Sequence, residues 1–180
     1  MLQQRLRDRT SLRSTGGDLV YYLVFRPDEM LKVKRRLKSW RKQLELADWD
    51  VCVLSLAEVL SEFFTTYPLR RWWLEAEQGA DVSEVNETLR AALLDEGVVE
   101  QRIRATLAEL EGKPKGLLII TDIEALHPYL RIGAIEQRLQ GKVHVPTVIL
   151  YPGLRRGQSN LSFLGIYPED GNYRSIHIGG

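Results

Sequence analysis

Two short apolar runs separated by a helical pattern constrain the fold more than any other feature of the chain. The runs are Leu117–Ile120 and Val145–Leu150, and the helical pattern between them covers Pro128–Gln140. Both runs are continuously apolar, which is typical of strands that a parallel sheet covers on both faces. The order strand, helix, strand therefore predicts a parallel βαβ unit within residues 116–165.

Two more strands are expected earlier in the chain. Leu19–Phe25 and Asp50–Leu56 are rich in apolar and aromatic residues, and a helical pattern follows each of them. Residues 68–112 then predict a helical insertion, which Gly97 divides into separate helices. We therefore expect an α/β fold with three layers and a mainly parallel sheet, resembling a P-loop-type domain without the P-loop.

The two ends of the chain have different patterns. Residues 1–16 are rich in arginine with sparse leucines, which predicts a short helix or arm. Leu161–Tyr167 and Tyr173–Ile178 predict two strands, and the turn residues between them favour a C-terminal β-hairpin. Residues 1–180 are expected to form a single domain.

Composition excludes several classes of protein. The net charge is +1, with 44% hydrophobic and 27% charged residues, so the whole chain carries no strong field for nucleic acid or membrane. The single cysteine, Cys52, excludes an intrachain disulfide and a cysteine-rich zinc site. No apolar run approaches the ~20 residues of a membrane span, and the first residues lack a secretory pattern. We expect a cytoplasmic protein without a membrane partner.

The motifs of nucleotide-binding and hydrolytic enzymes are absent from the sequence. A P-loop needs Gly-x-x-x-x-Gly-Lys-Ser/Thr after the first strand, whereas Val24–Glu29 contains no glycine and places acids there. The Gly-x-Gly-x-x-Gly fingerprint is missing, and His127, His144 and His177 are far apart in sequence. We therefore predict no catalytic residue, no cofactor, no metal and no enzymatic activity.

Asp122 and Glu124 are the nearest approach to an enzymatic site. They follow the apolar run Leu117–Ile120, as a magnesium-holding acid follows a strand in many NTPases. One alternative is a cryptic nucleotide-binding or metal-assisted protein that uses this vestigial acidic strand end. The other is structural, because Thr121 or Asp122 can cap the next helical turn.

A basic amphipathic helix is predicted over residues 30–44. Its apolar stripe is formed by Met30, Val33, Leu37, Trp40 and Leu44. Cations fill most of the remaining positions, and the candidate nucleic-acid contacts are Lys32, Arg35, Arg36, Lys38, Arg41 and Lys42. The helix is either a DNA-contacting or acid-binding surface or simply the solvated face of an amphipathic helix.

Two segments are candidates for binding a protein partner. Trp72 and Trp73 lie beside two arginines, and they are either a helix docked on the body or an exposed aromatic anchor. Residues 151–160 predict a loop at the end of a central strand, where ligands and partners often meet a parallel sheet. Its candidate contacts are Tyr151, Pro152, Gly153, Arg155, Arg156 and Gln158, although the loop can also be a long turn into the next strand.

The same C-terminal region resembles a known family. Tyr151-Pro152-Gly153, Gly157-Gln158, Phe163-Leu164-Gly165 and Gly171-Asn172-Tyr173-Arg174 are similar to the closing signature of the BrxB family, and Leu117–Arg131 is similar to its preceding block. BrxB proteins are small components of BREX phage-defence systems, which methylate host DNA and block replication of unmethylated phage. The resemblance implies a non-enzymatic adaptor that docks the PglZ-like phosphatase-fold protein and the PglX-like methyltransferase.

Overall fold

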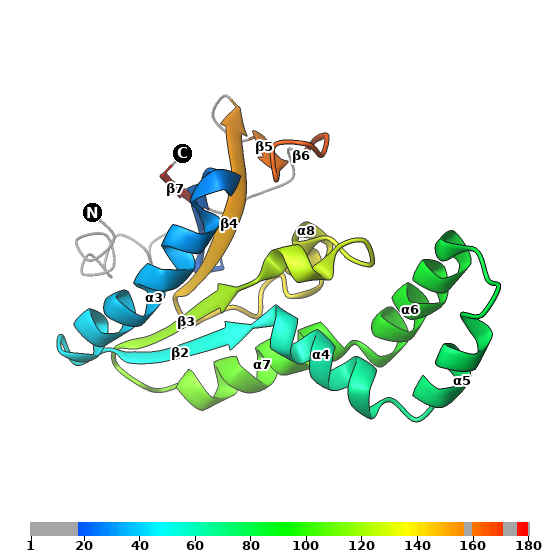
Figure 1. Ribbon diagram of the computed structural model, residues 1–180. Helices are drawn as coiled ribbons and strands as arrows, with labels where there is room; N and C mark the ends of the chain where they lie inside the picture. The colour runs from blue at the N-terminus through cyan, green and yellow to red at the C-terminus, as the bar shows by residue number, and fades with distance from the viewer. Residues whose placement is uncertain (1–17, 157–159, 171–175, 180) are drawn as a thin grey trace.

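The computed structural model describes residues 18–156, 160–170 and 176–179. The predicted arm of residues 1–16 and the candidate contact Gln158 lie outside the described residues. The described part of the chain forms helices on both faces of a mostly parallel sheet (Figure 1). This arrangement confirms the predicted three-layer α/β fold.

The sheet combines a parallel body with a small antiparallel extension. Its order is β2-β3-β4-β1-β7, and all these neighbours run parallel. Strand β4 also pairs antiparallel with β5, and β5 pairs antiparallel with β6. The strands are β1 (Val20–Phe25), β2 (Asp50–Ser55), β3 (Gly116–Thr121), β4 (Thr147–Arg156), β5 (Asn160–Phe163), β6 (Glu169–Asp170) and β7 (Ile176–Gly179).

The helices begin and end where local signals place them. Asp81 caps α6 by accepting a hydrogen bond from the Ser83 amide, and Gly97 separates α6 from α7 in a left-handed conformation, as expected. None of the described helices has the length and apolar character that a membrane crossing needs. The helical segments are η2 (Pro27–Glu29), α3 (Met30–Glu45), α4 (Leu56–Thr66), α5 (Arg70–Ala76), α6 (Val82–Glu96), α7 (Val98–Leu110), η3 (Ile123–Leu126) and α8 (Ile132–Arg138).

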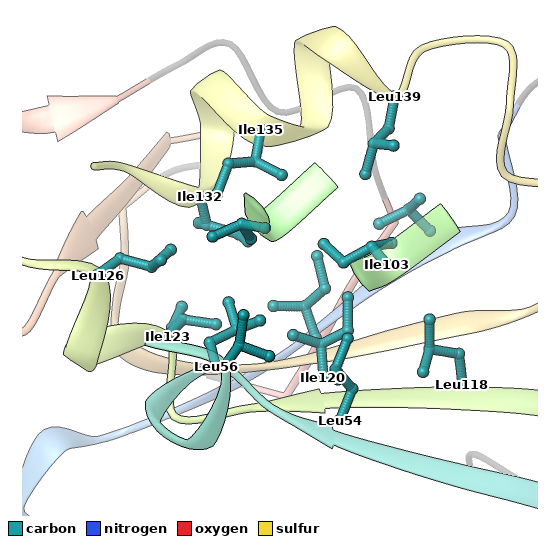
Figure 2. Packing of buried hydrophobic residues seen from close by; sticks show 14 of the residues in the cluster. Leu54, Leu56, Ile103, Leu118, Ile120, Ile123, Leu126, Ile132, Ile135 and Leu139 are labelled. Atoms are coloured by element: carbon teal, nitrogen blue, oxygen red, sulfur yellow. The ribbon is translucent and has the colours of Figure 1, made fainter. Parts of the chain in front are cut away.

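The larger hydrophobic core lies on the face of the sheet that α4, α7 and α8 cover. Figure 2 shows isoleucines of α7 and α8 meeting leucines and isoleucines of the strands across this core. Burying one such side chain contributes about 1.5–3 kcal/mol. The opposite face carries a second cluster, in which Val33 and Leu44 of α3 are buried with Tyr21 and Ile119 of the strands.

The expected C-terminal hairpin has a different pairing. The described part of Tyr173–Ile178 does not pair with Leu161–Tyr167, because β5 joins β4 and β6 whereas β7 lies parallel to β1. Turn-forming residues favour a local hairpin, but β1 has a free edge at which Ile178 lies opposite Leu23. The long-range pairing completes the parallel sheet.

Two helical regions also differ from their expected form. The crossover between β3 and β4 is not one helix over residues 128–140, but the short η3 followed by α8. Within residues 68–112, α7 lies against the sheet and contributes Ile103 and Leu107 to the core. Only α5 and α6 project away from the body, as Figure 1 shows.

Candidate functional site

A polar cluster lies at the carboxyl ends of β2 and β3. Ser55 and Thr121 are opposite each other in the parallel register, and Asp122 follows Thr121 with a positive φ of 59°. The hydroxyls of Ser55 and Thr121 both donate to Oδ2 of Asp122, each at 2.7 Å. The strand ends therefore hold this carboxylate in one orientation.

Lys34 of α3 completes this cluster from the other side. Its Nζ lies 2.6 Å from Oδ1 of Asp122 and 2.6 Å from Oε1 of Glu124. The preceding residue, Val33, is buried against the sheet, and Lys34 lies at the carboxyl ends of the strands. The lysine side chain is 40% exposed, whereas the two carboxylates are only 19% and 22% exposed.

The pKa values of both partners reflect this arrangement. Partial burial raises the pKa of Asp122, but hydrogen bonds from Lys34, Thr121 and Ser55 outweigh it and leave the pKa below its ordinary value. Burial lowers the pKa of Lys34, but the hydrogen bonds and charges of Asp122 and Glu124 leave that pKa raised. Both groups are therefore held in their charged forms.

This geometry changes the interpretation of the acidic strand end. Asp122 was predicted as a possible helix cap, but neither it nor Thr121 caps η3 with its side chain. Asp122 and Glu124 instead share one ammonium, so a magnesium ion would have to displace Lys34. Among the described residues, no group of three or more His, Cys, Asp or Glu side chains is placed to hold a metal ion.

The first part of the predicted loop, residues 151–156, is a strand in the structure. Strand β4 continues through Arg156, because residues 153–156 pair with β5. Tyr151, Pro152 and Gly153 are buried, so their burial does not fit the prediction that they contact a partner directly. Arg155 is exposed on the extension.

Close packing explains why this part of the chain is buried. The Tyr151 ring lies edge-on to Phe163 of β5, with centroids 5.4 Å apart. A Cβ on Gly153 would lie only 2.6 Å from the Ser162 carbonyl oxygen and 2.5 Å from the Tyr151 ring, so glycine permits the approach of β5. Tyr151 and Gly153 therefore support the pairing of β4 with β5 through buried packing.

The helical arm, defined here as α5 and α6 (residues 70–96), exposes several large apolar residues. Successive helical residues face different directions, and Trp72 and Trp73 differ accordingly. Trp73 stacks on Tyr67, with centroids 4.5 Å apart and planes 7° apart, whereas Trp72 is 58% exposed. The packing of Trp73 fits the interpretation of a helix docked on the body, whereas the partner-binding interpretation of Trp72 stays a prediction.

Further apolar side chains are exposed on the arm, and others line a groove beside it. Leu69, Leu74 and Val82 are exposed on or beside the arm. A groove opens between α4, α5 and α6, and its walls include Phe64, Trp73, Leu74, Val85, Leu89 and Tyr129. Exposed aromatic and aliphatic residues beside such a groove are typical of a protein-binding surface.

The predicted basic helix exists as α3 and is exposed along most of its length. Three of its cations are engaged: Lys34 at the sheet edge, Lys32 with Glu29, and Arg41 with Glu45. The other candidate contacts have no ion pair with a described residue, and they are Arg35, Arg36, Lys38 and Lys42. Three cations of α3 thus take part in ion pairs within the described structure, and the other four do not.

Sequence patterns did not identify two residues of the polar cluster. Ser55 is marked by Ser-x-x-Glu, a capping-box pattern, and its hydroxyl does accept from the Glu58 amide. Lys34 is one of seven cations in the helix, and only its position next to the apolar Val33 distinguishes it. A signal was therefore present for Ser55 and weak for Lys34.

Comparison with known proteins gives a family assignment. The family model described as BREX protein BrxB matches residues 52–178, well over half of the chain. The match includes β3, the helical arm and the extension of β4, and it leaves α3 outside. Searches of curated proteins and of solved structures gave no significant match. By this match the chain belongs to the BrxB family of BREX proteins.

Proposed function

We propose that the protein is a non-enzymatic cytoplasmic adaptor that docks other proteins of a BREX phage-defence system. The candidate partners are the PglZ-like phosphatase-fold protein and the PglX-like methyltransferase, so the adaptor would support host DNA methylation and phage restriction. Membership of the BrxB family supports the BREX setting. The identity of the partners is the finer part of the proposal.

The observation that carries the adaptor role is the apolar surface of the helical arm. Trp72 is 58% exposed, and Leu69 and Leu74 are exposed on the same segment of the chain. Tryptophan is enriched among the residues that dominate binding energy at protein interfaces. Each Å² of apolar surface that a partner removes from water contributes about 25 cal/mol to the free energy of association, before the costs of binding are subtracted.

The strand-end cluster supports the non-enzymatic part of the proposal. In a parallel α/β sheet, this edge is where ligands usually bind. Here Lys34 lies at the carboxyl ends of the strands and pairs with Asp122 and Glu124. These ion pairs hold α3 against the strand ends. The acids therefore stabilise a scaffold. The purified protein is expected to release no phosphate from ATP or GTP with magnesium.

Co-purification tests the adaptor role directly. The tagged full chain is co-expressed with the PglZ-like and PglX-like proteins of the same system and isolated at low salt. We expect at least one partner to co-purify in stoichiometric amount. Failure to recover either partner would contradict the adaptor proposal.

A matched pair of variants then tests the surface. Trp72→Ala should weaken partner binding by about 30-fold, which corresponds to ~2 kcal/mol for an interface hot spot. Leu46→Ala is the control, because Leu46 is 77% exposed on a different part of the molecule, just after α3. Equal binding by both variants would show that the partner docks elsewhere.

A further inference from the structure

The exposed face of α3 carries hydrogen-bond donors, and the carboxylate of the helix, on its last residue Glu45, pairs with Arg41. From Met30 to Leu44 the sequence contains seven cations and no acidic residue. Arg35, Lys38 and Lys42 recur at three and four residues, so they form one stripe on the side opposite the buried Val33 and Leu44. Beside the stripe, three further exposed side chains also offer donors, namely Arg36, Ser39 and Gln43.

The stripe lacks the pairing that surface helices elsewhere in this chain show. Arg71 pairs with Glu75 and Arg90 pairs with Glu87, as is common on a solvated helix. The acids nearest the stripe in sequence, Glu29 and Glu45, pair with Lys32 and Arg41. Among the described residues, four cations of α3 therefore remain without an acidic partner, and they are Arg35, Arg36, Lys38 and Lys42.

We propose that α3 binds the sugar-phosphate backbone of duplex nucleic acid through Arg35, Arg36, Lys38 and Lys42. Arginine, lysine, serine and glutamine are the side chains that contact phosphate oxygens. The rise from Arg35 to Lys42 is about 10 Å along a straight helix, and a duplex carries one negative charge per ~1.7 Å of its axis. Several phosphates therefore lie within reach of one stripe.

A nucleic acid fits this surface better than an acidic protein does. The centres of protein interfaces are depleted in lysine and enriched in aromatic residues and arginine, and α3 exposes two lysines of the proposed site but no aromatic ring. Between Lys32 and Gln43, the exposed side chains of α3 are all polar or cationic, and its half-buried Leu37 and Trp40 belong to the cluster packed on the sheet. The exposed Leu31 and Leu46 lie only at the two ends of this stretch. The donors that recur between them are complementary to a regular row of phosphates. This inference does not depend on the adaptor proposal, because α3 lies outside both the family match and the arm.

Fluorescence anisotropy with the full chain and a labelled 20-base-pair duplex of arbitrary sequence tests the proposal. Four phosphate contacts predict that log K falls against log salt with a slope of about −3.6. Affinity should then decrease about 100-fold between 50 and 200 mM salt. No binding at micromolar protein in 50 mM salt, or a flat salt response, would overturn the proposal.

Two variants with equal net charge separate the stripe from a general charge effect. The first replaces Arg35, Arg36, Lys38 and Lys42 by glutamine. The control replaces four other exposed cations by glutamine, namely Arg71, Arg90, Arg104 and Lys142. We expect the first variant to lose at least 100-fold in affinity at 50 mM salt and to lose the salt slope, while the control stays within about three-fold.

The remaining outcomes are also decisive. Circular dichroism melting verifies that both variants are folded, and the exposure of all eight positions predicts small changes. Equal weakening in the two variants would overturn the proposal, because only net charge would then matter. Tighter binding to poly-glutamate than to the duplex at equal salt would also overturn it and would assign the stripe to an acidic protein.

Discussion

Helix α3 and the helical arm are both exposed, but they present opposite chemistry and are held in different ways. Helix α3 is anchored by Val33 and Leu44 and shows cations to solvent. In α5 no residue is buried, and Trp72 is exposed. One small domain can therefore offer a polar surface anchored by buried residues and an apolar surface without such an anchor in α5. Two such surfaces suit two kinds of partner.

The largest expected effect comes from weakening the anchor of α3. Leu44 is 4% exposed, so Leu44→Ala should destabilise the fold by about 2–5 kcal/mol. Leu74→Ala in the arm should change stability by less than ~0.5 kcal/mol, because its side chain is already exposed. Urea unfolding of both variants measures the difference. Similar losses would mean that the arm is as firmly integrated as α3.

An intermediate effect is expected at the contact between α3 and the strand ends. Asp122→Asn or Lys34→Met should cost about 1–2 kcal/mol, between the values for exposed and for buried ion pairs, because the cluster is partly exposed. The control Arg71→Met removes an exposed pair with Glu75 and should cost less than ~0.5 kcal/mol. A cost at Asp122 no larger than at Arg71 would show that the cluster does not hold α3.

The same cluster predicts a dependence on pH. The pKa of Asp122 is lowered in the folded protein, so its contribution is complete above the ordinary value of about 4 and is lost as pH falls through the folded value. The pKa of Lys34 is raised, so its contribution is complete below about pH 10.4 and is lost as pH rises through the folded value. The stability gap between wild type and Asp122→Asn should therefore be constant near pH 7 and shrink below about pH 4.

The smallest effect on stability is expected at Trp72. Trp72→Ala should leave the free energy of unfolding within ~0.5 kcal/mol of wild type, because the ring is 58% exposed. Trp73→Ala removes the stack on Tyr67 and should cost at least about 1 kcal/mol. Thermal melting distinguishes the two. A large loss at Trp72 would indicate a structural role and would weaken its use as a binding probe.

Local patterns were sufficient for the elements but not for their long-range pairing. The apolar run Leu117–Ile120 gave β3 correctly, because its burial on both faces leaves a signal in consecutive residues. The predicted pairing partner of β7 was wrong. The residues next to β7 in the sequence carry no signal that an edge of β1 is available for pairing. The same limit explains Tyr151–Gly153, where proline and glycine indicate a turn but pairing with β5 extends the strand.

The candidate sites follow the same rule. The packing of Trp73, but not that of Trp72, depends on α4, which contributes Phe63 and Phe64 to the aromatic cluster. The sequence identified the pair but not which member faces solvent. For Asp122 it identified the strand end, whereas the lysine that engages it comes from a helix 88 residues earlier in the chain.

Strand β4 has a mechanical consequence beyond its place in the fold. Its first residues pair with β3 and β1 in the middle of the parallel sheet, and its last residues carry β5. A force applied to β5 along the strand direction would load the hydrogen bonds on both sides of β4 together, in shear. Such bonds must break at once rather than one after another. A partner pulling on this extension would therefore load the central strand of the sheet directly.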